Sequence, residues 1–396
     1  MTDKKTLPLW LIALGTGSAV MGITLITPAL PVISEELNAL PNRVQLLLTF
    51  YLAMLATGQL VIGPLSDIYG RRVFFRLGAC LIALGGFLSL FFTDISILIL
   101  CRSLQGLGAA ACISMGRTML NDYFSKEDAS KAMATVQTIQ AVVPMLALSF
   151  GGAIVFLAGW QGVMGLIMAA GIILFLGSLK FLPETHPPTG EPLHFAKVKN
   201  GYHAVLTNGL FLNFMLVSAL QVGAFFTLNA FIPYAYKEIG VSTMAFGFYF
   251  AMTPLGYMTG NLFNRLYMVK KGIEFAALVG CSLSILSIAF IILIQITGGQ
   301  NPWALALPCA FFGFSNGLTV ANATIGGINA ARAQAGTASG LIGAFTMMAG
   351  GLGGAIVVAL GAAEAVLIGF ASLMVMVFLS FSSAFVIYRR YQKGAV

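Results

Sequence analysis

Charged side chains are scarce in this sequence. Only 9% of the 396 residues are Asp, Glu, Lys or Arg, whereas 58% are hydrophobic. A soluble globular domain carries roughly a quarter charged residues, and no soluble fold of this size can bury so much apolar surface. The scarcity of charge therefore excludes a soluble protein and predicts a polytopic membrane protein.

Cysteine and histidine are few, and neither is spaced for metal or redox chemistry. The cysteines lie in apolar segments, and their odd number of 5 favours packing over disulfides. The histidines His186, His194 and His203 are scattered in a polar stretch, where we expect solvated side chains and no metal. The motifs HExxH and the P-loop are missing, so we expect no enzyme and no cofactor.

Long apolar runs recur along the whole chain. Each has about 20 residues or more, enough to cross the hydrocarbon core, and lipid permits only helices for runs of this kind. We predict an all-α protein of about twelve transmembrane helices in two pseudo-symmetric six-helix bundles. The helices are expected near residues 8–33, 43–65, 73–92, 95–120, 130–156, 161–181, 208–235, 243–265, 273–297, 302–329, 335–360 and 364–388.

The longest polar interval divides the predicted helices six and six. Its proline content suits a linker, and a compact soluble domain would need more residues. We therefore expect an N-terminal six-helix bundle over residues 1–181, a cytoplasmic linker over 182–207 and a C-terminal six-helix bundle over 208–396.

The two halves retain a trace of each other. Gly260 near the end of the predicted eighth helix mirrors Gly63 near the end of the second, and Asn264 stands at the offset of Asp67. Duplicated halves around a central binding site near the bilayer midplane are a known plan of secondary transporters. The repeat therefore favours a transporter over a membrane scaffold.

The distribution of basic residues predicts the orientation in the membrane. With the N-terminus inside, only Arg43 and Lys237 of the 21 basic residues fall in outward loops, and only Arg102 falls within a helix. Short cytoplasmic loops carry an excess of Lys and Arg. We therefore expect both termini in the cytoplasm.

The stretch GPLSDIYGRR, residues 63–72, lies between two membrane-length runs. Gly63 removes a side chain where two helices could approach closely, and Asp67 ends one helix while Arg71 and Arg72 begin the next. A carboxylate that faces guanidinium groups at such a junction can form a latch that closes in one conformation and opens in another. The alternative is an ordinary basic loop that only fixes topology.

Arg102 is the deepest charge that the sequence predicts. A guanidinium in the bilayer is costly unless it faces water, a partner or an anionic ligand, so it is a functional candidate. Gln105 lies one turn on and can hydrogen-bond beside it. The alternative is an arginine that extends to the headgroups. The following GLGAAA resembles a dinucleotide fingerprint, but close packing of transmembrane helices explains these small residues better.

These motifs resemble the major facilitator superfamily of secondary transporters. Residues 63–72 are similar to the loop between helices two and three in its drug-exporter branch with twelve helices, which includes bicyclomycin and chloramphenicol resistance proteins. A basic residue is usual where Ile68 stands. The matching positions are Gly63, Asp67, Gly70, Arg71 and Arg72.

Other parts of the chain carry the same resemblance. Arg102, Gln105 and Gly106 are similar to a fourth-helix pattern implicated in proton transfer. The resemblance further implies a cytoplasmic gate of Asp67, Arg117 and Asp122, for which helix-end charges that satisfy dipoles and headgroups are the alternative. The remaining similar positions are Pro144, Gly151 and Gly152 of the antiporter signature, where Leu148 replaces a second proline, together with LPET at 182–185, Asn316, Gly317, Asn322 and AGTASG at 335–340.

The first predicted helix departs from this branch. Its members often carry an acid four positions before PALP, where this chain has Thr24. Every Asp and Glu falls in a predicted loop or at a helix end, so a lone Arg102 among neutral polar groups favours a neutral or anionic solute. The candidate substrate-binding residues are Thr24, Thr27, Arg102, Gln105, Gln137, Gln140, Gln221, Phe225, Asn229, Tyr249 and Asn316.

These expectations combine into a transporter that exports small amphipathic compounds by alternating access. Proton antiport, with the proton gradient as energy source, is implied by the resemblance alone. Two alternatives remain open: an exporter of one metabolite such as a carboxylate siderophore, and a facilitator without proton coupling. We expect a monomer whose partners are the solute, protons and lipid, with no nucleic acid.

Overall fold

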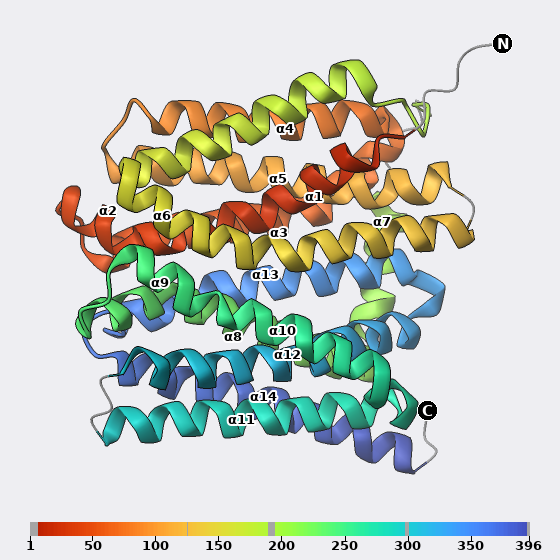
Figure 1. The fold of residues 1–396 in the computed structure, drawn as a ribbon. Coiled ribbons are helices and arrows are strands. Elements are labelled where there is room, and N and C mark those ends of the chain that lie inside the picture. The colour runs from red at the N-terminus through yellow and green to blue at the C-terminus, as the bar shows by residue number, and fades with distance from the viewer. Residues whose placement is uncertain (1–6, 125, 189–194, 298–300, 394–396) are drawn as a thin grey trace. The chain divides into compact units, whose positions relative to one another are not determined.

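The computed structural model describes residues 7–124, 126–188, 195–297 and 301–393, which form helices and the turns between them (Figure 1). The chain divides into two compact units, residues Met1–His194 and Phe195–Val396.

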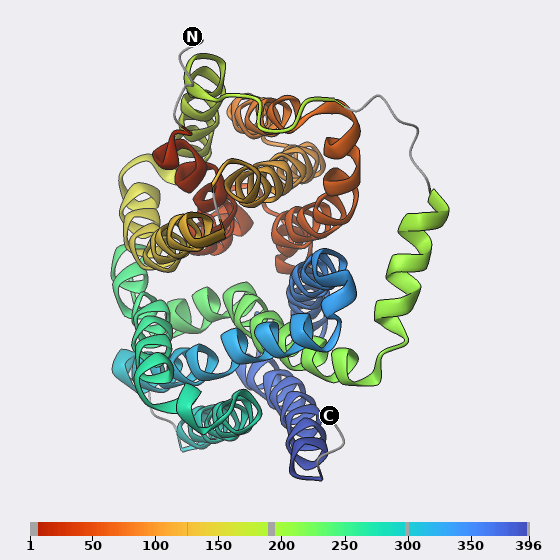
Figure 2. The same cartoon turned by 90° about the vertical axis from the view of Figure 1, so that its right-hand side faces the viewer.

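The first unit holds five long helices and one short one. Helix α5 packs against α3, α4 and α1, and α6 packs against α1 and α4. Figure 2 looks nearly along these helices and shows α5 surrounded by its neighbours. The bounds are α1 (Leu9–Thr24), α2 (Leu30–Glu36), α3 (Pro41–Tyr69), α4 (Arg71–Ser89), α5 (Ile95–Tyr123) and α6 (Lys126–Phe181).

The second unit is built in the same way around α8 and α12. Helix α8 packs against α12, α13 and α14, and α12 also packs against α10 and α11. Helix α7, which lies inside the predicted linker, contacts α8 and α13. The bounds are α7 (Phe195–Leu206), α8 (Gly209–Glu238), α9 (Thr243–Phe250), α10 (Met252–Phe263), α11 (Ile273–Ile296), α12 (Pro302–Ala330), α13 (Ala335–Ala359) and α14 (Val366–Gln392).

Ten helices among the described residues are long and apolar enough to cross a membrane. The difference from the predicted twelve has two causes. Helix α6 is continuous by hydrogen bonding but has non-helical backbone at Ala158 and Gly159, so it contains the predicted fifth and sixth helices. The predicted eighth helix is divided at Ala251 into α9 and α10. Pro254 explains that division because it lacks the N–H that would bond to the carbonyl of Phe250.

The predicted first helix is also broken. Helix α1 ends at Thr24, a short 3-10 turn covers Thr27–Ala29, and α2 continues from Leu30. Pro28 accounts for the position of the break, because its ring excludes the carbonyl of the residue four positions earlier and it offers no N–H. The break leaves the last carbonyl groups of α1 in need of other donors.

Several helix starts are fixed by side chains. Asp94 Oδ1 accepts hydrogen bonds from the backbone N–H groups of Ser96 and Ile97 at the start of α5. These bonds hold the pKa of the Asp94 carboxyl below its usual range. Asn208 and Asn301 cap α8 and α12 in the same way. Such caps set where the membrane segments begin.

Candidate functional site

Arg102 lies inside the first unit, on the face of α5 that packs against α1 and α3. Its side chain has 0% exposure, and Gln105, one turn further on, has 1%. The alternative in which Arg102 extends to the headgroups is therefore wrong. Both residues retain a buried nitrogen, Arg102 Nε and Gln105 Nε2, without a hydrogen-bond partner among the described residues.

The partners of Arg102 are all uncharged. Its guanidinium donates to the carbonyl oxygen of Gly22 and to Oε1 of Gln105. It also lies 4.2 Å from the centre of the Tyr51 ring, in a cation–π contact. The pairing with Gln105 was predicted from the sequence, whereas the contacts with Gly22 and Tyr51 were not.

The bond to Gly22 gives the guanidinium a structural task. The carbonyl of Met21 accepts from the N–H of Leu25, and that of Ile23 accepts from the Thr27 hydroxyl at 3.0 Å. Arg102 supplies the donor for the carbonyl between them. A cation at the C-terminal end of a helix is also favoured by the helix dipole. Arg102 thus caps the broken first helix.

Tyr51 is held between α1 and α5. Its hydroxyl donates to the carbonyl of Ala19 at 2.9 Å, so it contacts α1 one turn before the Arg102 bond. Gly106 brings α3 and α5 together, because a Cβ at that position would overlap the carbonyl oxygen of Tyr51. The small residues after Arg102 therefore serve close helix packing, as the sequence indicated.

No described carboxylate compensates this buried charge. Of the Asp and Glu side chains that the structure describes, none is buried. Thr24, where related exporters often carry an acid, donates instead to the carbonyl of Val20 at 2.9 Å. The electrostatic potential around Arg102 is therefore positive.

A second cluster of charges occupies the other end of the first unit, where α3 passes into α4. Arg71 Nε lies 3.1 Å from Oδ2 of Asp122 at the end of α5, and the Arg71 guanidinium also bonds to Ser66 Oγ. The ion pair and the bond to Ser66 together join the ends of α3, α4 and α5. The sequence had predicted a latch at this junction with Asp67 as its acid; Asp122 is the partner that the structure describes.

Glu184 completes this cluster, which we call the charged clasp (Ser66, Arg71, Asp122 and Glu184). Its Oε1 accepts from the backbone N–H of Arg71 at 2.9 Å, and its Oε2 accepts from that of Arg72 at 3.2 Å. A carboxylate at the first N–H groups of a helix is favoured by unpaired donors and by the dipole. Sequence reasoning missed this role, although Glu184 lies in the LPET motif.

Gly63 and Gly70 have different roles from those predicted. No described atom lies within 4 Å of a Cβ built at Gly63, so the predicted close helix approach at Gly63 is wrong. Gly70 has a φ of 93° and faces Glu184, whose Oε2 would lie 2.8 Å from a Cβ. The tight turn into the charged clasp therefore depends on Gly70.

Substitution of Gly70 by alanine is expected to destabilise the protein. The left-handed backbone costs a non-glycine residue about 1 to 3 kcal/mol, and the new methyl group would displace the Glu184 carboxylate. We expect Gly70→Ala to lower the unfolding temperature of the purified protein in detergent by several degrees. Gly63→Ala is the matched control with little expected change, and an equal loss in both variants would contradict this assignment.

The other predicted gating positions vary in how far the structure describes them. Arg117 is exposed and, within the described part of the chain, makes no hydrogen bond or ion pair with the charged clasp. Gly151 and Gly152 are buried in α6, and a Cβ at Gly151 would meet the Leu25 carbonyl oxygen at 2.9 Å, beside the break in the first helix. The side chains of Asp67, Gln137, Gln140 and Pro144 lie outside the described part of the structure.

In the second unit, Gln221 belongs to a buried polar network. Its Oε1 accepts from Ser284 Oγ at 3.0 Å, and its Nε2 donates to Cys281 Sγ at 3.5 Å. Ser284 also bonds to Ser315 at 2.7 Å. The network connects α8, α11 and α12 with neutral partners. Gln221 is thus engaged within the unit, and we do not keep it among the proposed substrate ligands.

The remaining candidates of the second unit are amides and aromatic rings. Asn229 and Asn316 are buried and donate to the backbone carbonyls of Phe225 and Phe312, one turn earlier. The Tyr249 ring stacks on that of Tyr236 at 6.0 Å. These candidates are uncharged amides and aromatic rings.

Comparison with known proteins adds three findings. Residues 12–357 match the family described as the Major Facilitator Superfamily. A bicyclomycin resistance protein homolog from Haemophilus influenzae is 26% identical over 361 residues, which cover 90% of each chain. The multidrug resistance protein MdtL from Salmonella heidelberg is 28% identical over 218 residues, 55% of each chain.

Solved structures show the same fold. A bacterial homolog of the human lysosomal transporter Spinster, in an inward-facing and unoccupied conformation, aligns with a TM-score of 0.74 at 14% identity over 97% of both chains. The D-xylose–proton symporter also aligns with a TM-score of 0.74, at 13% identity over 96% of this chain and 97% of that one. At these identities the likeness concerns the fold alone.

Proposed function

This chain belongs to the major facilitator superfamily, whose members are transporters and not enzymes, and we propose that it exports small amphipathic compounds, neutral or anionic, in exchange for protons. Export is supported by the relatives named for bicyclomycin and multidrug resistance. We place it in a bacterial inner membrane with both termini in the cytoplasm, as the distribution of basic residues favours.

One observation carries the proposed substrate charge: Arg102 is fully buried and its partners among the described residues are neutral. At an effective dielectric constant of about 20, a monovalent cation about 8 Å from this guanidinium is repelled by roughly 2 kcal/mol, or about thirtyfold in affinity. A neutral compound avoids this penalty and an anion gains from the same field. Within the first unit we propose Thr24, Thr27 and Gln105 as further ligands. The candidates of the second unit are Asn229, Tyr249, Asn316 and Phe225.

Proton coupling needs a group that gains and loses a proton during the cycle. Because no described acid is buried, we assign this part to the carboxylates at the charged clasp, Asp122 and Glu184, together with Asp67. Release of Arg71 from Asp122 would accompany the change between the two access states. The proton gradient would be the energy source, and no bound cofactor is needed.

The neutral environment of Arg102 also bears on the alternatives. An exporter dedicated to one carboxylate-bearing metabolite would need the guanidinium to exchange Gly22 for the ligand, and the capping role disfavours that exchange. A facilitator without coupling would transport without moving protons. Transport measurements distinguish these cases.

The proposal can be tested in everted vesicles with an imposed acid interior. Neutral, anionic and lipophilic cationic solutes are supplied in turn, and solute entry and the pH of the lumen are measured. We expect neutral or anionic solutes to enter and to make the lumen more alkaline, with cations transported about thirtyfold less well by the estimate above. Gln105→Glu places a carboxylate beside Arg102 at an atom that already accepts its hydrogen bond, so it is expected to raise cation transport selectively. Gln105→Met is the control.

Two outcomes would oppose the proposal. Cations transported by the unaltered protein as well as neutral solutes would refute the charge preference. Solute entry without alkalinisation would refute antiport and leave the facilitator.

A further inference from the structure

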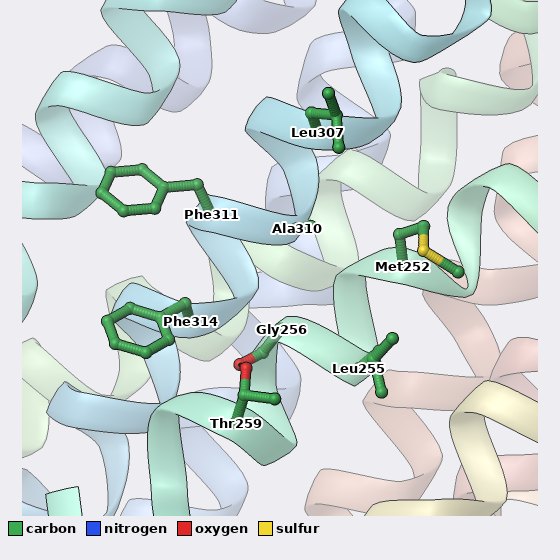
Figure 3. A pocket seen from close by; sticks show the side chains of 8 residues that line it. All are labelled: Met252, Leu255, Gly256, Thr259, Leu307, Ala310, Phe311 and Phe314. Atoms are coloured by element: carbon green, nitrogen blue, oxygen red, sulfur yellow. Dashed lines mark hydrogen bonds between the residues drawn. The ribbon is translucent and has the colours of Figure 1, made fainter. Parts of the chain in front are cut away.

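An apolar groove lies between α10 and α12 on the surface of the second unit. Figure 3 shows Phe311 and Phe314 of α12 on one side and Met252 and Leu255 of α10 on the other. Its volume is about 410 Å³. The groove floor forms where the two backbones touch, since a Cβ at Gly256 would overlap the carbonyl oxygen of Ala310.

The groove opens outward from the unit. Leu307 is 61% exposed and Phe311 is 42% exposed. On α10 the exposed residues follow one helical face from Leu255 through Thr259 to Leu262. Helix α12 is one of the candidate membrane spans, and α10 lies within the predicted eighth membrane helix, 243–265. We therefore expect lipid hydrocarbon around this face.

A row of aromatic rings leads from the groove to the end of the membrane segment. The Phe314 ring lies 5.7 Å from that of Phe263, which lies 5.0 Å from that of Tyr267. Tyr267 is 58% exposed and has the character of a residue at the membrane interface. The row therefore connects the groove with the polar edge of the bilayer.

Basic residues gather where this row ends. Arg265, Lys270 and Lys271 are exposed, and the Lys271 ammonium lies 5.9 Å from the Phe275 ring. Phe275 and Phe314 pack against the same buried cluster of Met268, Ala276 and Leu318, so this end of the row adjoins the groove wall. Glu274 is the acid on the adjoining first turn of α11, which leaves a net positive charge on this segment.

A π-helical turn, Asn264–Met268, presents these side chains. Asn264 is 5% exposed, and its Oδ1 accepts from Nδ2 of Asn322 on α12 at 2.8 Å. Asn322 also donates to the carbonyl of Leu318 at 2.7 Å. The amide pair thus holds the widened turn against α12, and π-turns often occur at functional positions.

We infer that this surface binds an anionic phospholipid of the leaflet next to the α10–α11 loop, with one acyl chain in the groove and the phosphate at Arg265, Lys270 and Lys271. The apolar groove matches the chain, and the basic segment matches the phosphate. Basic pockets between transmembrane helices bind anionic headgroups in this manner. The site is independent of the transported solute.

Photo-crosslinking of the full-length protein tests the assignment. Nanodiscs of phosphatidylcholine would contain a minor fraction of phosphatidylglycerol with a diazirine in its acyl chain. We expect labelling concentrated in residues 252–259 and 307–314, at least about tenfold above a phosphatidylcholine probe with the same chains, because each basic group near an anionic lipid contributes about fivefold. Even labelling of all lipid-facing helices would overturn the inference, as would equal labelling by both lipids.

Two variants probe the two halves of the site. Arg265→Gln with Lys270→Gln and Lys271→Gln is expected to remove the preference for phosphatidylglycerol, whereas Arg389→Gln with Arg390→Gln and Lys393→Gln removes the same charge from the end of α14 and should keep it. Thr259→Trp fills the groove and is expected to abolish labelling there. Three outcomes would each refute the site. The α14 control could have the same effect as the first triple variant, Thr259→Trp could leave the labelling unchanged, or millimolar inorganic phosphate could displace the lipid.

Discussion

Arg102→Lys is expected to reduce transport of a neutral solute by roughly fiftyfold while the protein still inserts in the membrane. Lysine keeps the charge but lacks the planar guanidinium group. That group donates hydrogen bonds to both Gly22 and Gln105 and lies over the Tyr51 ring. Loss of an interhelical hydrogen bond costs about 1 kcal/mol, and loss of the cation–π contact costs about 1 to 2 kcal/mol. Together these losses amount to about 2 to 3 kcal/mol. They lower the fraction of molecules in which the break in the first helix is ordered by roughly fiftyfold, and transport falls by the same factor.

The measurement is solute uptake by everted vesicles at matched protein amount, with the unfolding temperature recorded in detergent. Arg43→Lys is the matched control, since Arg43 is exposed near the start of α3. We expect this control to transport normally. Uptake by Arg102→Lys above half of the unaltered level would show that charge alone suffices and would remove the capping role.

Much of the fold could be predicted from the sequence because lipid leaves few options for apolar runs. The predicted segments 95–120 and 273–297 correspond to α5 (Ile95–Tyr123) and α11 (Ile273–Ile296). The breaks were harder to predict. Residues 8–33 had the length of one helix, and Pro28 interrupts it. The cap that stabilises the interrupted end comes from Arg102, which lies 80 positions beyond the capped residue Gly22.

The candidate site was predictable only where partners share one helix. Arg102 and Gln105 are one turn apart, so their pairing follows from helix geometry. Tyr51 and Gly22 reach the guanidinium through packing of α3 and α1, and nothing in an apolar run distinguishes a tyrosine with this role from others that pack in a core. The error at Gly63 has the same origin, since a glycine in a motif does not indicate which neighbour approaches it.

The sequence predicted an ion pair at the charged clasp but not which acid pairs with Arg71. Arg71 and two acids within reach at a helix junction predict an ion pair, and the sequence offers both Asp67 and Asp122. Choice between them depends on where α5 ends relative to α4. The role of Glu184 depends on the path of the chain after α6, because this path brings the carboxylate back to the first N–H groups of α4.

Arg71→Glu is expected to abolish transport, with a loss of more than about a hundredfold. The substitution removes the only described cation paired with Asp122 and adds a third carboxylate beside Asp122 and Glu184. Like charges about 4 to 6 Å apart repel by roughly 3 to 4 kcal/mol at an effective dielectric constant of about 20. We expect the clasp to stay open, so the conformation that it stabilises is depopulated.

A reversed pair distinguishes loss of the ion pair from general damage. Arg71→Glu combined with Asp122→Arg restores opposite charges across the same contact and is expected to recover at least about a tenth of the transport rate, as a coupled pair should. Arg72→Glu changes the same charge at the neighbouring position, whose recorded bond to Glu184 uses the backbone N–H, and is expected to lose far less. The clasp would be refuted if the reversed pair failed to transport and Arg72→Glu did as much damage as Arg71→Glu. Only the net positive charge of the segment would then matter, as in an ordinary loop that fixes topology.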